Sequence, residues 1–116
     1  MRSAAALLSL CLAVSGCANM RNLRLESQFD GTKLSGRLNT QTHVMEVGLE
    51  QEPYNGKAVE VSAADPAAAP PGARYYVARL KAFSNRSMRC EFNLLPQGGG
   101  KGVCYTGTIA YTLLIE

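Results

Sequence analysis

The sequence predicts an all-β protein, with a small antiparallel sandwich or barrel of about seven to eight strands after a cleaved signal peptide. Apolar residues recur at every second position in short segments, as they do in strands that bury one face. Glycine, proline and asparagine separate these segments. No segment beyond the first sixteen residues has the apolar period of a helix. A chain of 116 residues is long enough for one such domain.

An apolar leader opens the chain. Arg2 supplies a positive charge, and residues 3–14 are almost wholly apolar and carry no charge. This run is too short to span a bilayer as a helix, which takes about 20 residues, and it lacks the polar face of a buried amphipathic helix. We therefore expect residues 1–16 to be a signal peptide that is removed on export.

The junction after the leader reads Val14-Ser15-Gly16-Cys17. It resembles the lipobox of bacterial lipoproteins, in which an aliphatic residue and two small residues precede a cysteine. That family most often has leucine where this chain has Val14. Small side chains let a peptidase approach the backbone closely, and the cysteine supplies the thiol that receives a diacylglyceryl group. The resemblance implies cleavage between Gly16 and Cys17, which leaves Cys17 as an acylated N-terminus.

The same resemblance predicts where the domain is held. Several acyl chains anchor a protein stably at a membrane, whereas a single chain binds only marginally. In the family, an aspartate after the cysteine retains the protein in the inner membrane of enteric bacteria, and this chain has Ala18 instead. We therefore expect a lipid-anchored protein at the outer membrane that faces the periplasm. Residues 17–21 would be its tether and residues 22–116 its β-domain.

Alternating apolar residues predict four strands in the first half of the β-domain, at residues 22–28, 33–39, 43–50 and 57–63. His43 falls in phase with the apolar residues of the third strand, and we interpret it as a structural residue at the start of that strand. The run Pro53-Tyr54-Asn55-Gly56 predicts a turn before the fourth strand, because Asn-Gly readily adopts the positive φ angles of tight hairpin turns.

A proline-rich stretch, residues 64–73, interrupts the strand pattern. Proline cannot donate a ladder hydrogen bond and pushes the preceding residue into an extended conformation, so we expect a surface loop. Tyr54 and Tyr75, together with this loop, are a candidate contact surface. The strand pattern then resumes at residues 74–83, 87–95, 102–107 and 108–116, with a glycine-rich turn at 96–100.

The lipobox resemblance leaves a pair of cysteines for the fold. Of the four cysteines, Cys11 leaves with the leader and Cys17 takes lipid, so Cys90 and Cys104 remain. An even pair in an oxidising periplasm is expected to form a disulfide.

The geometry of the hairpin between these cysteines is compatible with that bond. If the hairpin axis passes near Gln97, partner residue numbers sum to about 194, and Cys90 lies directly opposite Cys104. The ring of Phe92 then covers Gly102. An axis one residue later would set the two cysteines diagonally, so the register is an assumption at this point.

Neither a catalytic site, a metal site nor a cofactor is expected. His43 is the only histidine, and no thiol remains to join it as a metal ligand once the cysteines are assigned. No serine has a nucleophile motif around it, and the glycine-rich run at 98–102 lacks the spacing of a phosphate loop. The net charge of +3 comes without a basic run, which argues against nucleic acid as a partner.

Two non-enzymatic functions remain. The first is a lipid-anchored envelope lipoprotein that serves as a structural, assembly or binding factor in the periplasm, with an envelope protein as its partner. The second is a periplasmic inhibitor of a lytic enzyme such as lysozyme. Small β-barrel lipoproteins that inhibit lysozyme carry a Ser-x-Ser/Gly-Ala-Arg/Lys-Tyr loop, and Pro71-Gly72-Ala73-Arg74-Tyr75 is similar to it. The serine of that loop and the family's downstream tryptophans are absent from this chain.

Overall fold

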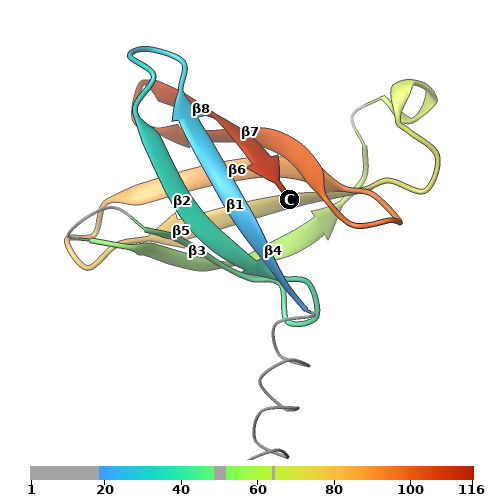
Figure 1. Cartoon of the computed structure of the whole chain (residues 1–116), viewed down its shortest axis with the longest axis horizontal. Coiled ribbons are helices and arrows are strands. Elements are labelled where there is room, and N and C mark those ends of the chain that lie inside the picture. The colour runs from blue at the N-terminus through green and yellow to red at the C-terminus, as the bar shows by residue number, and fades with distance from the viewer. Residues whose placement is uncertain (1–18, 49–51, 64) are drawn as a thin grey trace, which may run out of the picture.

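Eight β-strands, connected in sequence order, close into an antiparallel barrel in the computed structural model (Figure 1). The structure describes residues 19–48, 52–63 and 65–116, so the leader, Gly16 and Cys17 lie outside the described residues. The elements are β1 (Met20–Ser27), β2 (Lys33–Asn39), β3 (Val44–Gly48), β4 (Tyr54–Val61), the short 3-10 helix η1 (Pro66–Ala68), β5 (Arg74–Lys81), β6 (Ser87–Leu94), β7 (Gly100–Thr106) and β8 (Ile109–Ile115). The predicted all-β class is confirmed, and the architecture is the barrel rather than the sandwich.

The barrel closes because the first strand pairs with the last. Leu25 of β1 lies opposite Leu34 on β2 and opposite Leu113 on β8. In Figure 1, β1 (blue) and β8 (red) run side by side. Each of the eight strands therefore has a hydrogen-bonded neighbour on both sides, which satisfies the backbone groups that an open sheet leaves at its edges.

The interior of the barrel is filled with side chains from the inward-facing, alternate positions of the strands. Leu38, Met45, Leu80 and Leu113 have no exposed surface. The core also contains Leu23, Leu25, Val47, Tyr54, Ala58, Tyr76, Ala78, Ala82, Met88, Cys90, Phe92, Cys104, Tyr111 and Ile115. Full burial of a leucine contributes about 1.5–3 kcal/mol relative to leaving it in water, so the alternation seen in the sequence carries most of the driving force for this fold.

The predicted turn at residues 53–56 is wrong. Tyr54, Asn55 and Gly56 belong to β4, where Gly56 lies opposite Met45 of β3. A Cβ atom at Gly56 would collide with the carbonyl oxygen of Arg79, so this glycine allows β5 to approach closely rather than supplying a turn. The ring of Tyr54 is only 3% exposed and faces the core, which removes it from the candidate contact surface.

Several other strand boundaries also differ from the sequence-based expectation by one to three residues, including the starts of β1 and β3. β1 begins at Met20, so Met20 and Arg21, which were assigned to the tether, are part of the barrel. β3 begins at Val44, and His43 precedes it with a φ angle of 65°. His43 is held there by its backbone, because its N–H donates to the carbonyl of Asn39 (2.7 Å) and its carbonyl accepts from Ala58 (2.8 Å).

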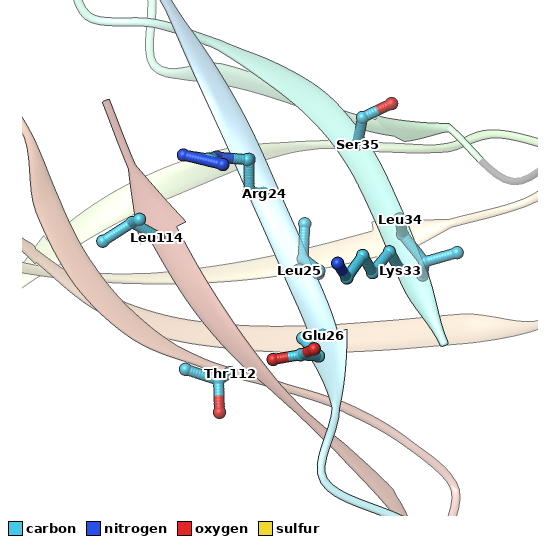
Figure 2. A pocket seen from close by; sticks show the side chains of 8 residues that line it. All are labelled: Arg24, Leu25, Glu26, Lys33, Leu34, Ser35, Thr112 and Leu114. Atoms are coloured by element: carbon cyan, nitrogen blue, oxygen red, sulfur yellow. The ribbon is translucent and has the colours of Figure 1, made fainter. Parts of the chain in front are cut away.

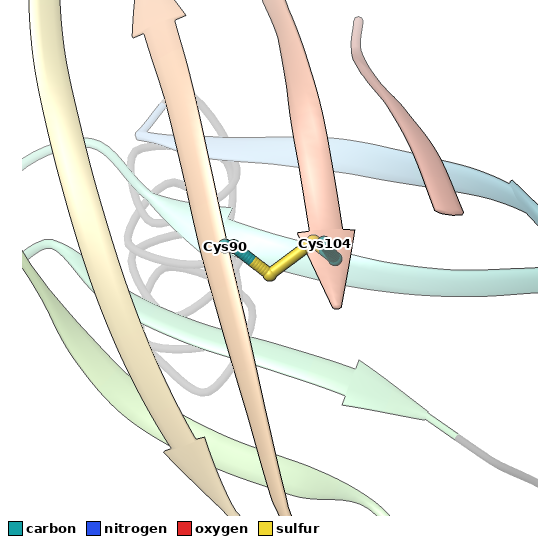
Figure 3. The surroundings of a disulfide bond; sticks show 2 residues. All are labelled: Cys90 and Cys104. Atoms are coloured by element: carbon teal, nitrogen blue, oxygen red, sulfur yellow. A yellow bond between two sulfur atoms is a disulfide. The ribbon is translucent and has the colours of Figure 1, made fainter. Parts of the chain in front are cut away.

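The hairpin of β6 and β7 has the register that an axis near Gln97 predicts. Cys90 lies opposite Cys104, and Phe92 lies opposite Gly102. The two cysteine Cα atoms are 4.0 Å apart, and the Sγ atoms are joined at 2.12 Å inside the barrel (Figure 3). Neither cysteine has exposed surface. A Cβ atom at Gly102 would collide with the carbonyl oxygen of Glu91 and would lie 2.6 Å from the Cβ of Phe92, so only glycine fits at this position.

Candidate functional site

Three connections gather at one end of the barrel, which we call the loop end. Because the strands alternate in direction, the β2–β3, β4–β5 and β6–β7 connections share the end at which β1 begins. These connections comprise residues 40–43, 62–73 and 95–99. Figure 1 shows the β4–β5 loop, with its short helix, extending beyond the strands. Loops displayed on a rigid barrel are common places for binding.

The β4–β5 loop confirms the surface loop that its prolines predict, and local hydrogen bonds shape it. Asp65 accepts a hydrogen bond from the N–H of Ala67 at its carboxylate (3.2 Å) and one from Ala68 at its backbone carbonyl (3.1 Å). Gly72 has a φ angle of 77°, and a Cβ atom there would lie 2.6 Å from Cγ of Pro96. The loop therefore rests on the β6–β7 turn at this glycine.

Between these connections the barrel mouth forms a hollow of about 480 Å³. Arg21 is in phase with the buried Leu23 on β1, and Arg74 is in phase with the buried Tyr76 on β5. Both arginines line the hollow, as does Tyr76. The remaining lining residues are Thr40, Gly72, Leu94, Leu95, Pro96, Gln97 and Gly98. The inward-facing rows of two strands thus end in cations at the mouth of an apolar core.

The two arginines differ in their surroundings. The half-buried Arg21 lies against Gly98, where any side chain would collide with the guanidinium group. Arg21 forms no ion pair with another described residue, whereas Nε of Arg74 lies 4.0 Å from Oε2 of Glu60. The Arg74 side chain is 70% exposed, so this long ion pair adds little stability and leaves the guanidinium free to bind.

Tyr76 forms the floor of the hollow. Its ring lies 5.1 Å from the ring of His43 and 5.6 Å from the ring of Phe92, measured between centroids. Aromatic pairs at such distances favour each other by about 0.5–1.5 kcal/mol beyond burial. The interpretation of His43 as a structural residue is consistent with this packing, because its ring packs against the ring of Tyr76.

Of the residues that sequence reasoning selected, those that the structure describes do not gather at one site. Cys17 and Gly16 lie outside the described residues, and the Cys90–Cys104 pair lies within the barrel wall. Tyr75 is half-buried beside the β4–β5 loop.

The arginines of the mouth were missed because they are far apart in the chain and share no motif. One signal could have found them. Each of Arg21 and Arg74 stands two positions before a buried residue of its strand, so each continues the inward-facing row with a charged side chain.

The hairpin end, opposite the loop end, holds two carboxylates with shifted pKa values. The backbone N–H of Thr32 donates to Oδ1 of Asp30 at 3.0 Å, and this bond is the main cause of a lowered Asp30 pKa. Hydrogen bonds from the side chain and backbone of Ser84, and then the charge of Arg86, lower the pKa of Glu52. Both carboxylates hold turns in place, so these shifts are structural.

A second hollow, of about 530 Å³, lies on the outer face of β1, β2 and β8 (Figure 2). Its exposed residues form two cross-strand rows, Ser35–Arg24–Leu114 and Lys33–Glu26–Thr112. Arg24 also forms an ion pair of 2.9 Å with Glu116. Because charges of both signs alternate here and the ion pair is exposed, this face is solvated and weakly stabilised rather than specific.

Comparisons of the chain with protein-family models, with curated proteins and with solved structures found no match. Among the described residues, no three His, Cys, Asp or Glu side chains come together as metal ligands. That part of the chain also has no helix long and apolar enough to cross a membrane. We take the loop end, where cationic and aromatic side chains meet, as the candidate site.

Proposed function

We propose that this protein is a non-enzymatic lipoprotein of the bacterial envelope, lipid-anchored at the outer membrane, whose barrel acts as a structural, assembly or binding factor in the periplasm. The observation that carries the proposal is the run Val14-Ser15-Gly16-Cys17, which directly follows the apolar leader. A lipidated cysteine at this position would hold the barrel close to the bilayer. The chain from Cys17 to Met20 spans at most about 10 Å when fully extended.

The described fold supports a binding role in such a setting. A closed barrel with a cross-strand disulfide is a stable scaffold in the oxidising periplasm, where disulfides persist. Its β4–β5 loop and the neighbouring turns offer a surface for an envelope protein partner at the loop end. Tyr75, which is half-buried beside that loop, is the aromatic residue placed to take part.

The anchor is tested in a Gram-negative host by membrane fractionation and intact mass. We expect the full chain to lose residues 1–16, to gain the mass of a lipidated N-terminal cysteine and to partition with the outer membrane. Cys17→Ala should abolish both the lipid mass and the membrane partition. Cys11→Ala, which alters the other cysteine of the leader region, is the matched control and should leave both unchanged. A Cys17→Ala protein that still partitioned into membranes would refute the anchor.

Inhibition of a lytic enzyme is the second candidate, and the position of residues 71–75 favours it. This stretch, which is similar to the inhibitory loop of lysozyme-inhibiting lipoproteins, ends the projecting β4–β5 loop. Arg74 stands at the start of β5 with its side chain 70% exposed. Residues 18–116, assayed at micromolar concentration, should inhibit lysozyme, and Arg74→Ala should weaken the inhibition while Arg89→Ala does not. Absence of inhibition by the unaltered protein would remove this candidate.

A further inference from the structure

The barrel mouth concentrates positive charge. Arg21 and Arg74 line the hollow, and the lining includes no carboxylate from any described residue. Glu60 approaches Arg74 alone, at 4.0 Å, and is not part of the lining. Two positive charges at one mouth repel each other, and an anion bound between them offsets this repulsion because it attracts both.

The hydrogen-bond donors at the mouth are available. The side chain of Arg21 forms no hydrogen bond or ion pair within the described residues, and a guanidinium offers five N–H donors in a planar fork. Gly98 leaves the room that this guanidinium occupies, because a Cβ atom there would collide with it.

The hydroxyl of Tyr76 adds a neutral hydrogen-bond donor to the two arginines. Tyr76 is 4% exposed, yet its hydroxyl has no hydrogen-bond partner among the described residues. No buried polar side-chain atom in that part of the chain lacks a partner, which is consistent with a Tyr76 hydroxyl that opens toward the hollow that Tyr76 lines. The mouth therefore presents a hydroxyl at its floor and two guanidinium groups on its walls.

We propose that this hollow binds a phosphate group through Arg21, Arg74 and the hydroxyl of Tyr76. A carboxylate carries a single negative charge, whereas a phosphate monoester carries about 1.5 to 2 and has three strong acceptor oxygens. Two arginines and one hydroxyl match that charge and that number of acceptors. Arginine forks also bind phosphate with two parallel hydrogen bonds, which gives the contact its geometry.

The phosphate can come from a soluble ion or ester, or from the head group of a lipid. β1 begins at the mouth, so a lipid on Cys17 would bring the hollow near the head groups of the anchoring membrane. The binding chemistry is the same for both sources. Its test does not involve Cys17, so failure of the lipid anchor and failure of this site are distinguishable.

The direct probe is inorganic phosphate, titrated at low ionic strength into residues 18–116, which hold every strand of the closed barrel. Amide chemical shifts of Gly72 and Gly98 should move and saturate. Arg21→Gln and Arg74→Gln should each weaken binding about tenfold, because each removes a charge-assisted contact. Salt should weaken it as well.

A matched set of variants separates the site from general charge. Tyr76→Phe removes only the hydroxyl and keeps the buried ring, so affinity should fall severalfold with an unchanged unfolding midpoint. Arg89→Gln removes an exposed arginine on the outer face of β6 and should leave phosphate binding unchanged. Arg21→Lys keeps the positive charge but loses the planar guanidinium fork. It replaces Arg21→Gln in the phosphate titration if Arg21→Gln does not fold.

Non-saturating shifts, or an equal loss of binding in Arg89→Gln, would overturn the proposal and indicate an adventitious ion only. Vesicle sedimentation then distinguishes the two sources of the phosphate group. Sedimentation with phosphatidic acid vesicles, but not with phosphatidylserine vesicles, and its loss in Arg21→Gln would assign the site to a lipid phosphate. Saturable binding of inorganic phosphate without vesicle binding would assign it to a soluble one.

Discussion

Breaking the Cys90–Cys104 bond is expected to lower the free energy of unfolding by about 3 kcal/mol. The two residues are 14 positions apart in sequence. A cross-link that closes a loop of about 15 residues removes conformational entropy from the unfolded chain worth about 3 kcal/mol at 25 °C. The folded state needs little adjustment, because the register of β6 and β7 already sets the two residues opposite each other.

The assay compares oxidised protein, thiol-reduced protein and the double variant Cys90→Ala/Cys104→Ala in urea and in thermal scans. With a denaturant slope of about 1–3 kcal/mol per molar, reduction should lower the urea midpoint by about 1–3 M. For a domain of this size it should lower Tm by about 12–24 °C. The alanine variant should be less stable than the reduced protein, because it also removes two sulfur atoms that have no exposed surface.

The reduced protein is the decisive comparison, since it keeps both sulfur atoms in the core and changes only the cross-link. Equal urea midpoints for the oxidised and reduced protein would refute the reasoning. A loss that appeared only in the alanine variant would show that the cysteines stabilise by packing and not by constraining the unfolded chain.

Three further predictions concern the barrel itself. Gly102→Val should cost about 2–3 kcal/mol through overpacking, while Gly48→Ala, whose Cβ atom would meet only an ordinary contact at 3.6 Å, should be near neutral in urea unfolding. Leu113→Ala should cost about 2–5 kcal/mol, whereas Leu114→Ala on the outer face of the same strand should change stability by less than about 0.5 kcal/mol; similar losses would contradict the assigned faces. The folded pKa of Glu52 is below its unfolded value of 4.5, so its stabilisation is present above pH 4.5 and is lost as pH falls through the folded pKa. Glu52→Gln should therefore weaken the pH dependence of the urea midpoint between pH 6 and 3. A difference in urea midpoint from the unaltered protein that stayed the same at every pH would argue against this role.

Much of the fold follows from local pattern. β2 has the predicted bounds, and β6 shows why the alternation is reliable, because Met88, Cys90 and Phe92 all face the core. The prediction at residues 53–56 failed for a physical reason. Asn-Gly favours a turn when nothing else constrains the backbone, but here the close approach of β5 requires a glycine within β4.

The candidate site was less predictable than the fold. No motif in the sequence pairs Arg21 with Arg74, although each continues the inward-facing row of its strand, and Tyr76 looks like any strand tyrosine. Their meeting depends on which strands are neighbours across the mouth and on how far each inward row extends. Those are properties of the closed sheet and not of any segment.

The sequence by itself predicted the strands and the inward face of most of them, and it carries the lipobox resemblance on which the proposed anchor rests. These depend on neighbouring residues, since side chains alternate across a strand whatever its partners are. The tertiary structure decided that the sheet closes through β1 and β8, because a sandwich and a barrel share the same alternation and differ only in pairing. Closure then brought two inward-facing arginines to one mouth, and no local pattern records that proximity.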